Sequence, residues 1–214
     1  MAAYTIAVLI SGSGTNLQAL IDAERAGDLG ATIGLVVSDR ADAYGLRRAL
    51  DAGIPAAFVP LPSAPKAQRA ATRAAWEQRL LAVVAAYQPH LIVSSGFMRI
   101  LSASFLAQCG ALVINQHPAL LPDGGGDSFT TAGGTTIPAL RGAHVVPDAL
   151  RLGLPITGCT VHRVTPLVDD GPVLAQAEVP IRPDDSEDSL HDRIKAEERR
   201  LIVQVVRQLA TGAA

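Results

Sequence analysis

Residues 5–26, TIAVLISGSGTNLQALIDAERA, contain the pattern that decides the fold. Thr5 to Ile10 is an apolar, β-branched run typical of a buried strand, and Asn16 to Ala26 is predicted to be a helix. The glycine-rich turn Ser11–Asn16 lies between them. A strand, a glycine-rich turn and a helix in this order indicate an α/β fold with a candidate anion site at the helix N-terminus.

The same alternation continues along the first two thirds of the chain. Further strands are predicted at Thr32 to Ser38, Ala56 to Val59, Leu91 to Ser95 and Ala111 to Asn115. Further helices are predicted at Tyr44 to Ala52 and from about Ala67 to Tyr87. Apolar strands that alternate with helices are typical of a parallel sheet covered on both faces. The predicted fold class is therefore α/β, with a single doubly wound, mostly parallel sheet.

The order of elements changes after residue 118. Residues 119–141 are rich in Gly, Thr and Pro and are predicted to form a loop, followed by a short helix at Pro147 to Leu152. Two strands with only a loop between them, Ile156 to Val164 and Val173 to Val179, indicate an antiparallel C-terminal extension of the sheet. A last helix, with Ser186 as its N-cap, is predicted to run to Gly212.

The composition is that of a soluble globular protein. Of the 214 residues, 49% are hydrophobic and 18% are charged, which excludes a disordered or collagen-like chain. The formal net charge is −2 without a basic stripe, so we expect small-molecule partners and no nucleic acid. No apolar run approaches the ~20 residues of a membrane span, and residues 1–10 lack the basic start of a signal peptide. We expect a cytoplasmic protein without a membrane partner.

Residues 1–214 are expected to form a single domain. No internal repeat or linker separates a second core, and this length supports a core without disulfides or a structural metal. Cys109 and Cys159 lie in apolar contexts without metal-ligand spacing, and we expect buried thiols in a reducing compartment. No metal site is predicted.

The turn Ser11–Asn16 is the first candidate for a binding site. Glycine lets the backbone approach an anion, and the amides at the helix N-terminus point at it. A dinucleotide fingerprint requires a third glycine where this chain has Leu17, and no Gly-Lys-Ser/Thr follows for a Walker loop. We interpret the turn as a phosphate site assisted by Ser13, Thr15 and Asn16; an ordinary glycine turn is the alternative.

The segment Asn115-Gln116-His117-Pro118 is the second candidate, because open α/β sheets bind ligands beyond the carboxyl ends of their strands. His117 is a proton carrier near neutral pH, and Asn115 offers an amide donor for a developing oxyanion. Side chains two apart on a strand point to the same side. A structural histidine in a turn before proline is the alternative.

Two further segments, the loop with Asp169 and Asp170 and the segment Gly96–Leu101, are candidate site residues only if they lie near the other candidates. Asp169 and Asp170 are ordinary turn residues unless their loop lies against His117, whose imidazolium a carboxylate would stabilise. Gly96–Leu101 follows a buried strand and places an apolar wall beside Arg99, as a flat heteroaromatic ligand requires. Packing at the entry to a helix explains the second segment equally well.

Taken in chain order, five motifs resemble the formyltransferase superfamily, and within it the folate-dependent branch that acts on glycinamide ribonucleotide in purine biosynthesis. The motifs are SGSGTNLQ (11–18), GFMRIL (96–101), NQHPALLP (115–122), TGCTVH (157–162) and DDGPV (169–173). The resemblance covers residues 5 to 210. Asn-x-His-Pro with a downstream Asp-x-Gly is specific for the superfamily, and the phosphate loop points to the glycinamide ribonucleotide branch.

The resemblance implies a phosphate-binding half, about residues 1–100, and a folate-binding and catalytic half, about residues 101–214. The residues it implies for binding 5′-phosphoribosylglycinamide are Gly14, Thr15, Asn16, Asp184, Asp185, Ser186 and Glu187. Those it implies for the folate pocket are Arg73, Met98, Arg99, Ile100, Leu101, Asn115, Thr165, Pro166, Leu167, Val168 and Asp169. His162 matches a family histidine that helps to order the site.

The resemblance also implies the chemistry. The formyl group of the co-substrate 10-formyltetrahydrofolate would pass to the amine of the ribonucleotide, with Asn115, His117 and Asp169 as catalytic residues. Asn115 and His117 would meet the oxyanion, and Asp169 would raise the pKa of His117 and keep it protonated. The reaction requires no metal, and the protein would be a monomer or homodimer.

The resemblance is interrupted at residues 123–141. Family members usually have about three residues there, so about 16 form an insertion next to His117, and its glycine content favours mobility. We refer to residues 123–141 as the inserted segment.

Other functions remain open from the sequence. A formyltransferase acting on another amine, such as an amino sugar or methionyl-tRNA, or a formyltetrahydrofolate hydrolase would use the same Asn/His/Asp core. The tRNA enzyme and the hydrolase normally have an additional domain, for which we expect no room in 214 residues. A non-enzymatic, nucleotide-binding Rossmann-type module is a further alternative, because Asp39 ends the second strand as a ribose-binding acid would, although Leu17 counts against it.

Overall fold

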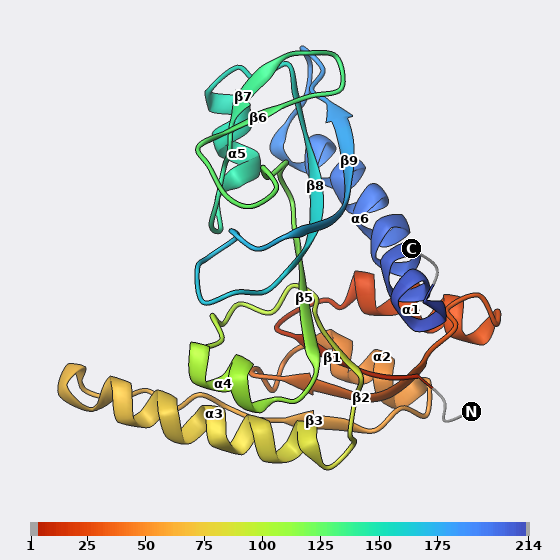
Figure 1. Ribbon diagram of the computed structural model, residues 1–214, viewed down its shortest axis with the longest axis vertical. Helices are drawn as coiled ribbons and strands as arrows, with labels where there is room; N and C mark the ends of the chain where they lie inside the picture. The colour runs from red at the N-terminus through yellow and green to blue at the C-terminus, as the bar shows by residue number, and fades with distance from the viewer. Residues whose placement is uncertain (1–3, 213–214) are drawn as a thin grey trace.

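The computed structural model describes residues 4–212, so the first three residues of the N-terminal segment and the last two of the chain lie outside it. Its main sheet has seven strands: β1 (Thr5–Ile10), β2 (Thr32–Ser38), β3 (Ala56–Phe58), β4 (Leu91–Ser94), β5 (Leu112–His117), β8 (Ile156–Arg163) and β9 (Val173–Pro180). Their order is β3-β2-β1-β4-β5-β8-β9 (Figure 1). The first five strands are parallel, and β8 and β9 are antiparallel. The predicted fold class is confirmed.

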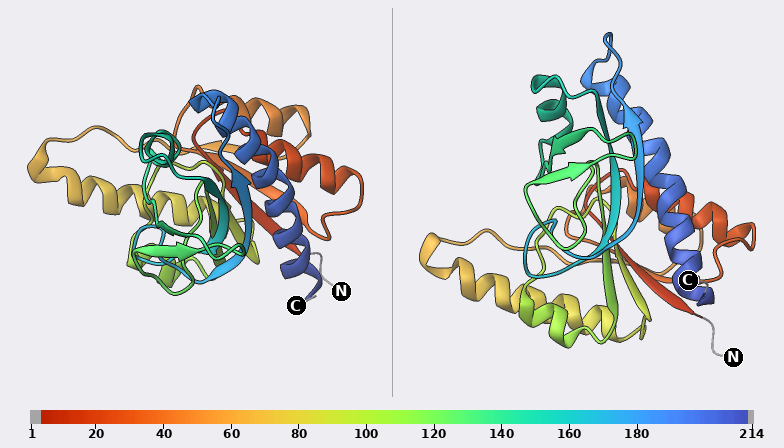
Figure 2. Two further views of the ribbon diagram at one scale, coloured as in Figure 1. Left: turned by 90° about the horizontal axis from the view of Figure 1, so that it is seen from above. Right: turned by 45° about the horizontal axis from the view of Figure 1, so that its top comes forward.

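Helices cover both faces of this sheet. They are α1 (Thr15–Arg25), α2 (Tyr44–Asp51), α3 (Arg69–Ala85), α4 (Ala103–Gln108), α5 (Val145–Arg151) and α6 (Glu187–Thr211). Alternate residues of β1 point to opposite faces: Ile6, Val8 and Ile10 join one apolar cluster, and Ala7 and Leu9 the other. Helices α1, α2, α5 and α6 contribute to the first cluster, and α3 and α4 to the second (Figures 1 and 2).

The long helix α6 packs along the antiparallel strands and reaches α1 near its C-terminal end (Figure 1). Ser186 caps it as predicted, since its hydroxyl accepts a hydrogen bond from the Ser189 amide at 3.2 Å. Gly212 ends it in the left-handed conformation. No helix among residues 4–212 is long and apolar enough to cross a bilayer.

The prediction that residues 119–141 form a loop is wrong in part. The segment contains a two-stranded hairpin of β6 (Ser128–Thr130) and β7 (Thr136–Pro138), which lies at the same end of the molecule as α5 (Figure 2). Its signal is present in the sequence, because residues that favour strands, Phe129-Thr130-Thr131 and Thr135-Thr136-Ile137, flank the turn-forming pair Gly133-Gly134. The many glycines of the segment concealed this pattern.

Smaller differences lie at the ends of elements. The short helix α4 was not predicted, and the predicted long helix begins with a 3₁₀ turn, η1 (Lys66–Gln68), before α3. Strand β5 continues to His117 rather than ending at Asn115. Both cysteines are free, but Cys159 is buried and Cys109 only partly so.

Candidate active site

Strand β5 presents two of the predicted catalytic side chains. Asn115 and His117 are two residues apart on β5, and both pair with the neighbouring strand β8. Asn115 lies opposite His162, and its amide nitrogen is 3.3 Å from His162 Nε2. His162 Nδ1 is 2.9 Å from the Arg163 carbonyl, which can only accept, so Nδ1 is the donor there. With Nδ1 engaged in this way, His162 presents Nε2 to the Asn115 amide nitrogen and orients that amide.

The loop between β8 and β9 carries Asp169 to this pair. Asp169 Oδ2 lies 3.4 Å from His117 Nδ1, and Asp169 Oδ1 lies 3.7 Å from His162 Nε2. All three side chains are buried. The loop that carries Asp169 therefore lies against His117, as a role for Asp169 beyond that of a turn residue requires.

The electrostatics of the pair differ from the prediction for His117. Burial lowers the pKa of the His117 imidazole, and this outweighs the opposite effects of the Asp169 carboxylate and the Leu140 carbonyl. Asp169 therefore favours the imidazolium, as expected, but the desolvation of the buried ring is the larger effect. For Asp169 itself burial opposes ionisation, but His162, His117 and the Gly142 amide together hold the pKa of its carboxyl below the ordinary value.

The inserted segment touches His117 directly. His117 Nε2 is 2.8 Å from the backbone carbonyl of Leu140, so Nε2 carries a proton and donates it to that oxygen. The carbonyl is an acceptor on the side of the ring opposite Asp169.

The predicted phosphate turn borders a cavity of about 320 Å³. Residues from Ser11 to Asn16 line it together with Arg40, Ser95, Gly96 and Met98. Gly14 caps α1 in the left-handed conformation (φ 68°), which leaves the first amides of the helix free for an anion. The cavity thus joins the phosphate turn to the predicted folate segment.

Two charged residues were not predicted from the sequence: Arg40, which lines this cavity, and Glu198, which contacts the phosphate turn through Asn16. Arg40 follows β2, where nothing in the local pattern marks it as a ligand residue. Glu198 is buried in α6, and its side chain bonds with that of Asn16, whose oxygen Oδ1 is a buried polar atom without a hydrogen-bond partner among residues 4–212. Burial raises the pKa of Glu198 to about 7. The sequence signal for Glu198 was a carboxylate on the apolar stripe of α6.

Four of the predicted folate residues are exposed apolar side chains on the loops after β4 and β8, which we call the apolar edge. Met98, Ile100, Leu167 and Val168 are large apolar side chains that are 45–66% exposed, whereas Leu101 is buried. Thr165 turns the second of these segments by accepting a hydrogen bond from the Leu167 amide, with Pro166 exposed between them. Four exposed apolar side chains on two loops indicate a ligand surface.

Arg99 connects this edge to the strand ends. Its Nε donates to the buried Asp39 carboxylate at 2.6 Å, and Asp39 also accepts from the Ser11 hydroxyl. Ser11 in turn accepts from the Met98 amide at 2.9 Å. Asp39 is therefore engaged within the protein, which removes the ribose-binding acid that the Rossmann-type alternative requires.

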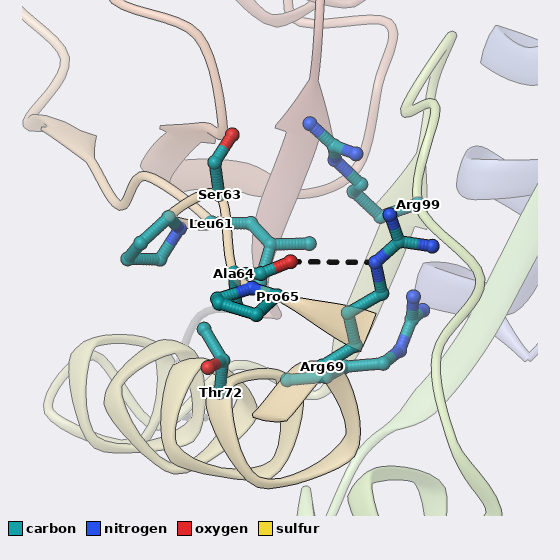
Figure 3. A pocket seen from close by; sticks show the side chains of 9 residues that line it. Leu61, Ser63, Ala64, Pro65, Arg69, Thr72 and Arg99 are labelled. Carbon is teal, nitrogen blue, oxygen red and sulfur yellow. Dashed lines mark hydrogen bonds between the residues drawn. The ribbon is translucent and has the colours of Figure 1, made fainter. Parts of the chain in front are cut away.

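A second cavity, of about 640 Å³, is lined in part by Arg99. Its lining residues are Leu61, Pro62, Ser63, Ala64, Pro65, Arg69, Thr72, Arg73 and Arg99. Figure 3 shows Arg69 reaching the Ala64 carbonyl and Arg99 facing the same space. Arg73 also donates to the Ile100 carbonyl, which connects this cavity to the apolar edge. Three cations without an acidic lining residue suit a carboxylate-bearing ligand.

Residues Asp184 to Glu187 are not brought to the site. They precede and begin α6, and about 12 residues of helix, roughly 18 Å, separate Ser186 from Glu198. Their polar contacts are local: Asp185 accepts from Arg193 at 2.7 Å, which holds the pKa of its carboxyl below the ordinary value, and Ser186 caps the helix. Among residues 4–212, no group of three or more His, Cys, Asp or Glu side chains could hold a metal ion.

The fold and the site together define a class of protein. Residues 4–206 match the family model described as formyl transferase, and the chain belongs to this family. Its relatives within the family are phosphoribosylglycinamide formyltransferases: the protein of Mycobacterium tuberculosis (strain H37Rv) is 41% identical over 96% of this chain and 85% of the relative. That of Escherichia coli (strain K12) is 37% identical over 97% and 87%. The chain also matches 14% of the trifunctional purine biosynthetic protein adenosine-3 of Drosophila melanogaster, at 39% identity.

Solved structures agree. Glycinamide ribonucleotide transformylase 1 from Symbiobacterium toebii superimposes with a TM-score of 0.83 at 38% identity, covering 98% of this chain and 89% of the other. Phosphoribosylglycinamide formyltransferase from Brucella melitensis does so with a TM-score of 0.81 at 33% identity, covering 99% and 98%. The resemblance recognised in the sequence motifs is confirmed.

Proposed function

We propose that this chain transfers the formyl group of 10-formyltetrahydrofolate to the amine of 5′-phosphoribosylglycinamide, a reaction of purine biosynthesis. The observation that carries the proposal is the convergence of Asn115, His117 and Asp169 between a phosphate-type cavity and an exposed apolar edge. The two ligands would approach the catalytic residues from these two sides. The names of the relatives in the same family support this choice of substrates.

The ribonucleotide would bind along the phosphate turn. Backbone amides after Gly14 and the polar groups of Thr15 and Asn16 would receive the phosphate. Glu198 and the unpaired Asn16 Oδ1 would accept from the ribose hydroxyls, because Glu198 lies between this turn and β5: its carbonyl accepts from the Gln116 side chain at 2.7 Å. We therefore place the ribose at Glu198 rather than at Asp184 to Glu187.

The folate would bind across the apolar edge. Its flat ring fits the exposed side chains of Met98, Ile100, Leu167 and Val168, which a ligand would cover. Its carboxylate end fits the arginine-lined cavity, where Arg73 and Arg99 face the same space. When bound, the folate supplies the formyl group that is transferred.

Asn115 and His117 would act on the formyl group and the attacking amine. Asn115, oriented by His162, would donate an N–H to the oxyanion. Once the ribonucleotide replaces the Leu140 carbonyl at His117, Asp169 would hold the ring proton on Nδ1, and Nε2 would accept the amine proton while Asp169 stabilises the resulting imidazolium. Nε2 would then return the proton to the leaving nitrogen. This sequence is compatible with the lowered pKa of His117, whereas a permanently protonated His117 is not.

An assay with purified protein tests the proposal. The protein is mixed with 10-formyltetrahydrofolate and 5′-phosphoribosylglycinamide, and the appearance of deformylated folate is followed. We expect release that depends on the ribonucleotide, and a loss of turnover on the order of 100-fold in Asn115→Ala, since one oxyanion donor is removed. Release without any amine would indicate a hydrolase, release with an amino sugar alone another formyltransferase, and no release a binding protein; each would contradict the proposal.

A further inference from the structure

The inserted segment is attached to the rest of the protein at three places. At its start, the Asp123 carboxylate accepts a hydrogen bond from the Val173 amide at 2.9 Å. At its hairpin, the Ala132 amide donates to the Glu178 carboxylate of β9 at 2.7 Å. At its end, Arg141 contacts the loop of Asp169. The segment is therefore tied on both sides of the catalytic residues.

The contacts of Arg141 are unusual for a partly exposed arginine. Its Nε donates to the backbone carbonyl of Asp169 at 3.1 Å. Its Nη2 donates to the Gly126 carbonyl at 2.7 Å and to Asp170 Oδ1 at 3.2 Å. One planar guanidinium thus joins the start of the inserted segment, its end and the catalytic loop.

Asp169 requires such support. It has a φ of 50°, a left-handed conformation that disfavours a residue with a side chain, and its carboxylate must face His117 at 3.4 Å. The Gly142 amide donates to Asp169 Oδ2 at 3.0 Å. Residues 141 and 142 therefore hold both the backbone and the carboxylate of Asp169.

We propose that Arg141 is a positioning residue, which fixes the strained Asp169 against His117 by bridging the inserted segment to the catalytic loop. This inference rests on the proposed function, which gives Asp169 its role. A lysine at position 141 would keep the charge but lack the planar fork that reaches three acceptors at once. The role therefore predicts that lysine does not replace Arg141.

The positive charge at position 141 is kept constant in the test, because this charge itself acts on His117. The charged and titratable groups around the His117 ring are Asp169, His162 and Arg141, and the Arg141 cation itself lowers the pKa of His117. Removing this cation would raise that pKa, whereas losing the contact with Asp169 would lower it. Arg141→Lys separates the two effects, because only the contact is lost.

The experiment compares Arg141→Lys with Arg151→Lys, an arginine of α5 that is paired with Asp148 and is 69% exposed. We expect Arg141→Lys to lower kcat about 10-fold to 100-fold with both KM values nearly unchanged, as a small displacement of a catalytic group does. NMR titration of the ligand-free protein should show a lower pKa for His117. In the control Arg151→Lys, kcat and the pKa of His117 should be the same as in wild type. A kcat within twofold of wild type together with an unshifted His117 titration would overturn the proposal.

A second variant covers the case in which Arg141→Lys lowers the melting temperature. Asp170→Ala removes one acceptor of the guanidinium from a partly exposed position, and we expect kcat to fall about fivefold; an unchanged kcat would again contradict the proposal. The NMR titration also distinguishes the two proposals. If wild-type protein shows no formyl transfer but the His117 titration still responds to Arg141→Lys, the proposed function fails and the positioning role stands.

Discussion

At the scale of single residues, the environment of His117 sets the expected pH dependence. Burial disfavours the imidazolium, and the nearby Asp169 carboxylate only partly compensates. A histidine that must be neutral to accept a proton is active above its pKa and inactive below it. A lowered pKa therefore keeps the base functional at neutral pH.

We expect kcat/KM to decline only below about pH 6.5, the ordinary value for histidine. In Asp169→Asn the carboxylate that favours the imidazolium is lost, so the residual activity should decline at a lower pH than in wild type. Profiles of kcat/KM against pH measure the acid limb of wild type and of Asp169→Asn. The exposed control Asp148→Asn should follow wild type; an acid limb that moves to higher pH in Asp169→Asn would contradict the assignment.

Glu198 couples binding to stability at the same scale. Its pKa, raised from 4.5 to about 7 by burial, means that the folded state holds a proton that the unfolded state releases. The stability that this proton contributes is present below about pH 4.5 and is lost as the pH rises to about 7. A buried carboxylate that lowers stability at neutral pH is typical of a binding site.

Glu198→Gln should therefore increase the free energy of unfolding at pH 8 by up to about 3 kcal/mol and leave it nearly unchanged at pH 4.5, while raising the KM for the ribonucleotide. Urea unfolding at the two pH values measures the first effect. The matched control is Glu197→Gln, the exposed neighbour that pairs with Arg200. If the stability difference between Glu198→Gln and wild type is the same at both pH values, Glu198 does not titrate as proposed.

At the scale of elements, the phosphate turn depends on the contact between the N-termini of α1 and α2. Gly14 adopts φ 68°, and a Cβ atom there would lie 2.7 Å from the Cα of Gly45. The Gly45 amide donates to the Gly12 carbonyl at 3.1 Å, and Arg48 Nε donates to the Ser13 carbonyl at 2.9 Å. Helix α2 therefore shapes the turn at the start of α1.

Gly14→Ala should move the two helices apart, because backbone atoms cannot yield as a flexible side chain can. We expect a loss of about 1 to 3 kcal/mol in the free energy of unfolding and a raised KM for the ribonucleotide, with the KM for the folate unchanged. Gly12→Ala, where a Cβ meets nothing within 4 Å, is the control for stability. Equal stability of the two variants would show that the contact is not needed.

At the scale of the whole molecule, one sheet separates two apolar clusters that lie on opposite faces. Trp76, the one tryptophan of the sequence, is buried in the cluster of α3 and α4, and Leu201 of α6 is buried in the other. We propose that the two clusters unfold together as one domain, since strands β1 to β5 each contribute side chains to both.

Leu201→Ala should then lower the stability reported by Trp76 fluorescence, although the two residues lie on opposite faces. The expected loss is about 2 to 5 kcal/mol, the cost of removing a buried leucine. Fluorescence and far-UV circular dichroism should give the same shifted midpoint. Leu152→Ala, at an exposed position after α5, should change it by less than about 0.5 kcal/mol. An unchanged Trp76 midpoint in Leu201→Ala would indicate two independent units.

The sequence alone determined the local features of this protein. Strand and helix periods predicted the parallel sheet, because burial on two faces selects apolar runs, and the motif around Asn115 and His117 predicted the family. Ser186 was recognised as a cap from its position before a helical pattern. The hairpin in the inserted segment was not predicted, because its strands of three residues are too short for a strand period to stand out among the glycines.

Tertiary structure decided what depends on distance through space. Glu198 lies 182 residues after Asn16 in the chain, and the packing of α6 on the sheet brings the two together. Asp184 to Glu187 were assigned to the site although the length of α6 keeps them away. The pKa of His117 depends on burial, on Asp169 and on Arg141 together, and the balance of these opposing effects is fixed only when the folded chain sets their distances and excludes water.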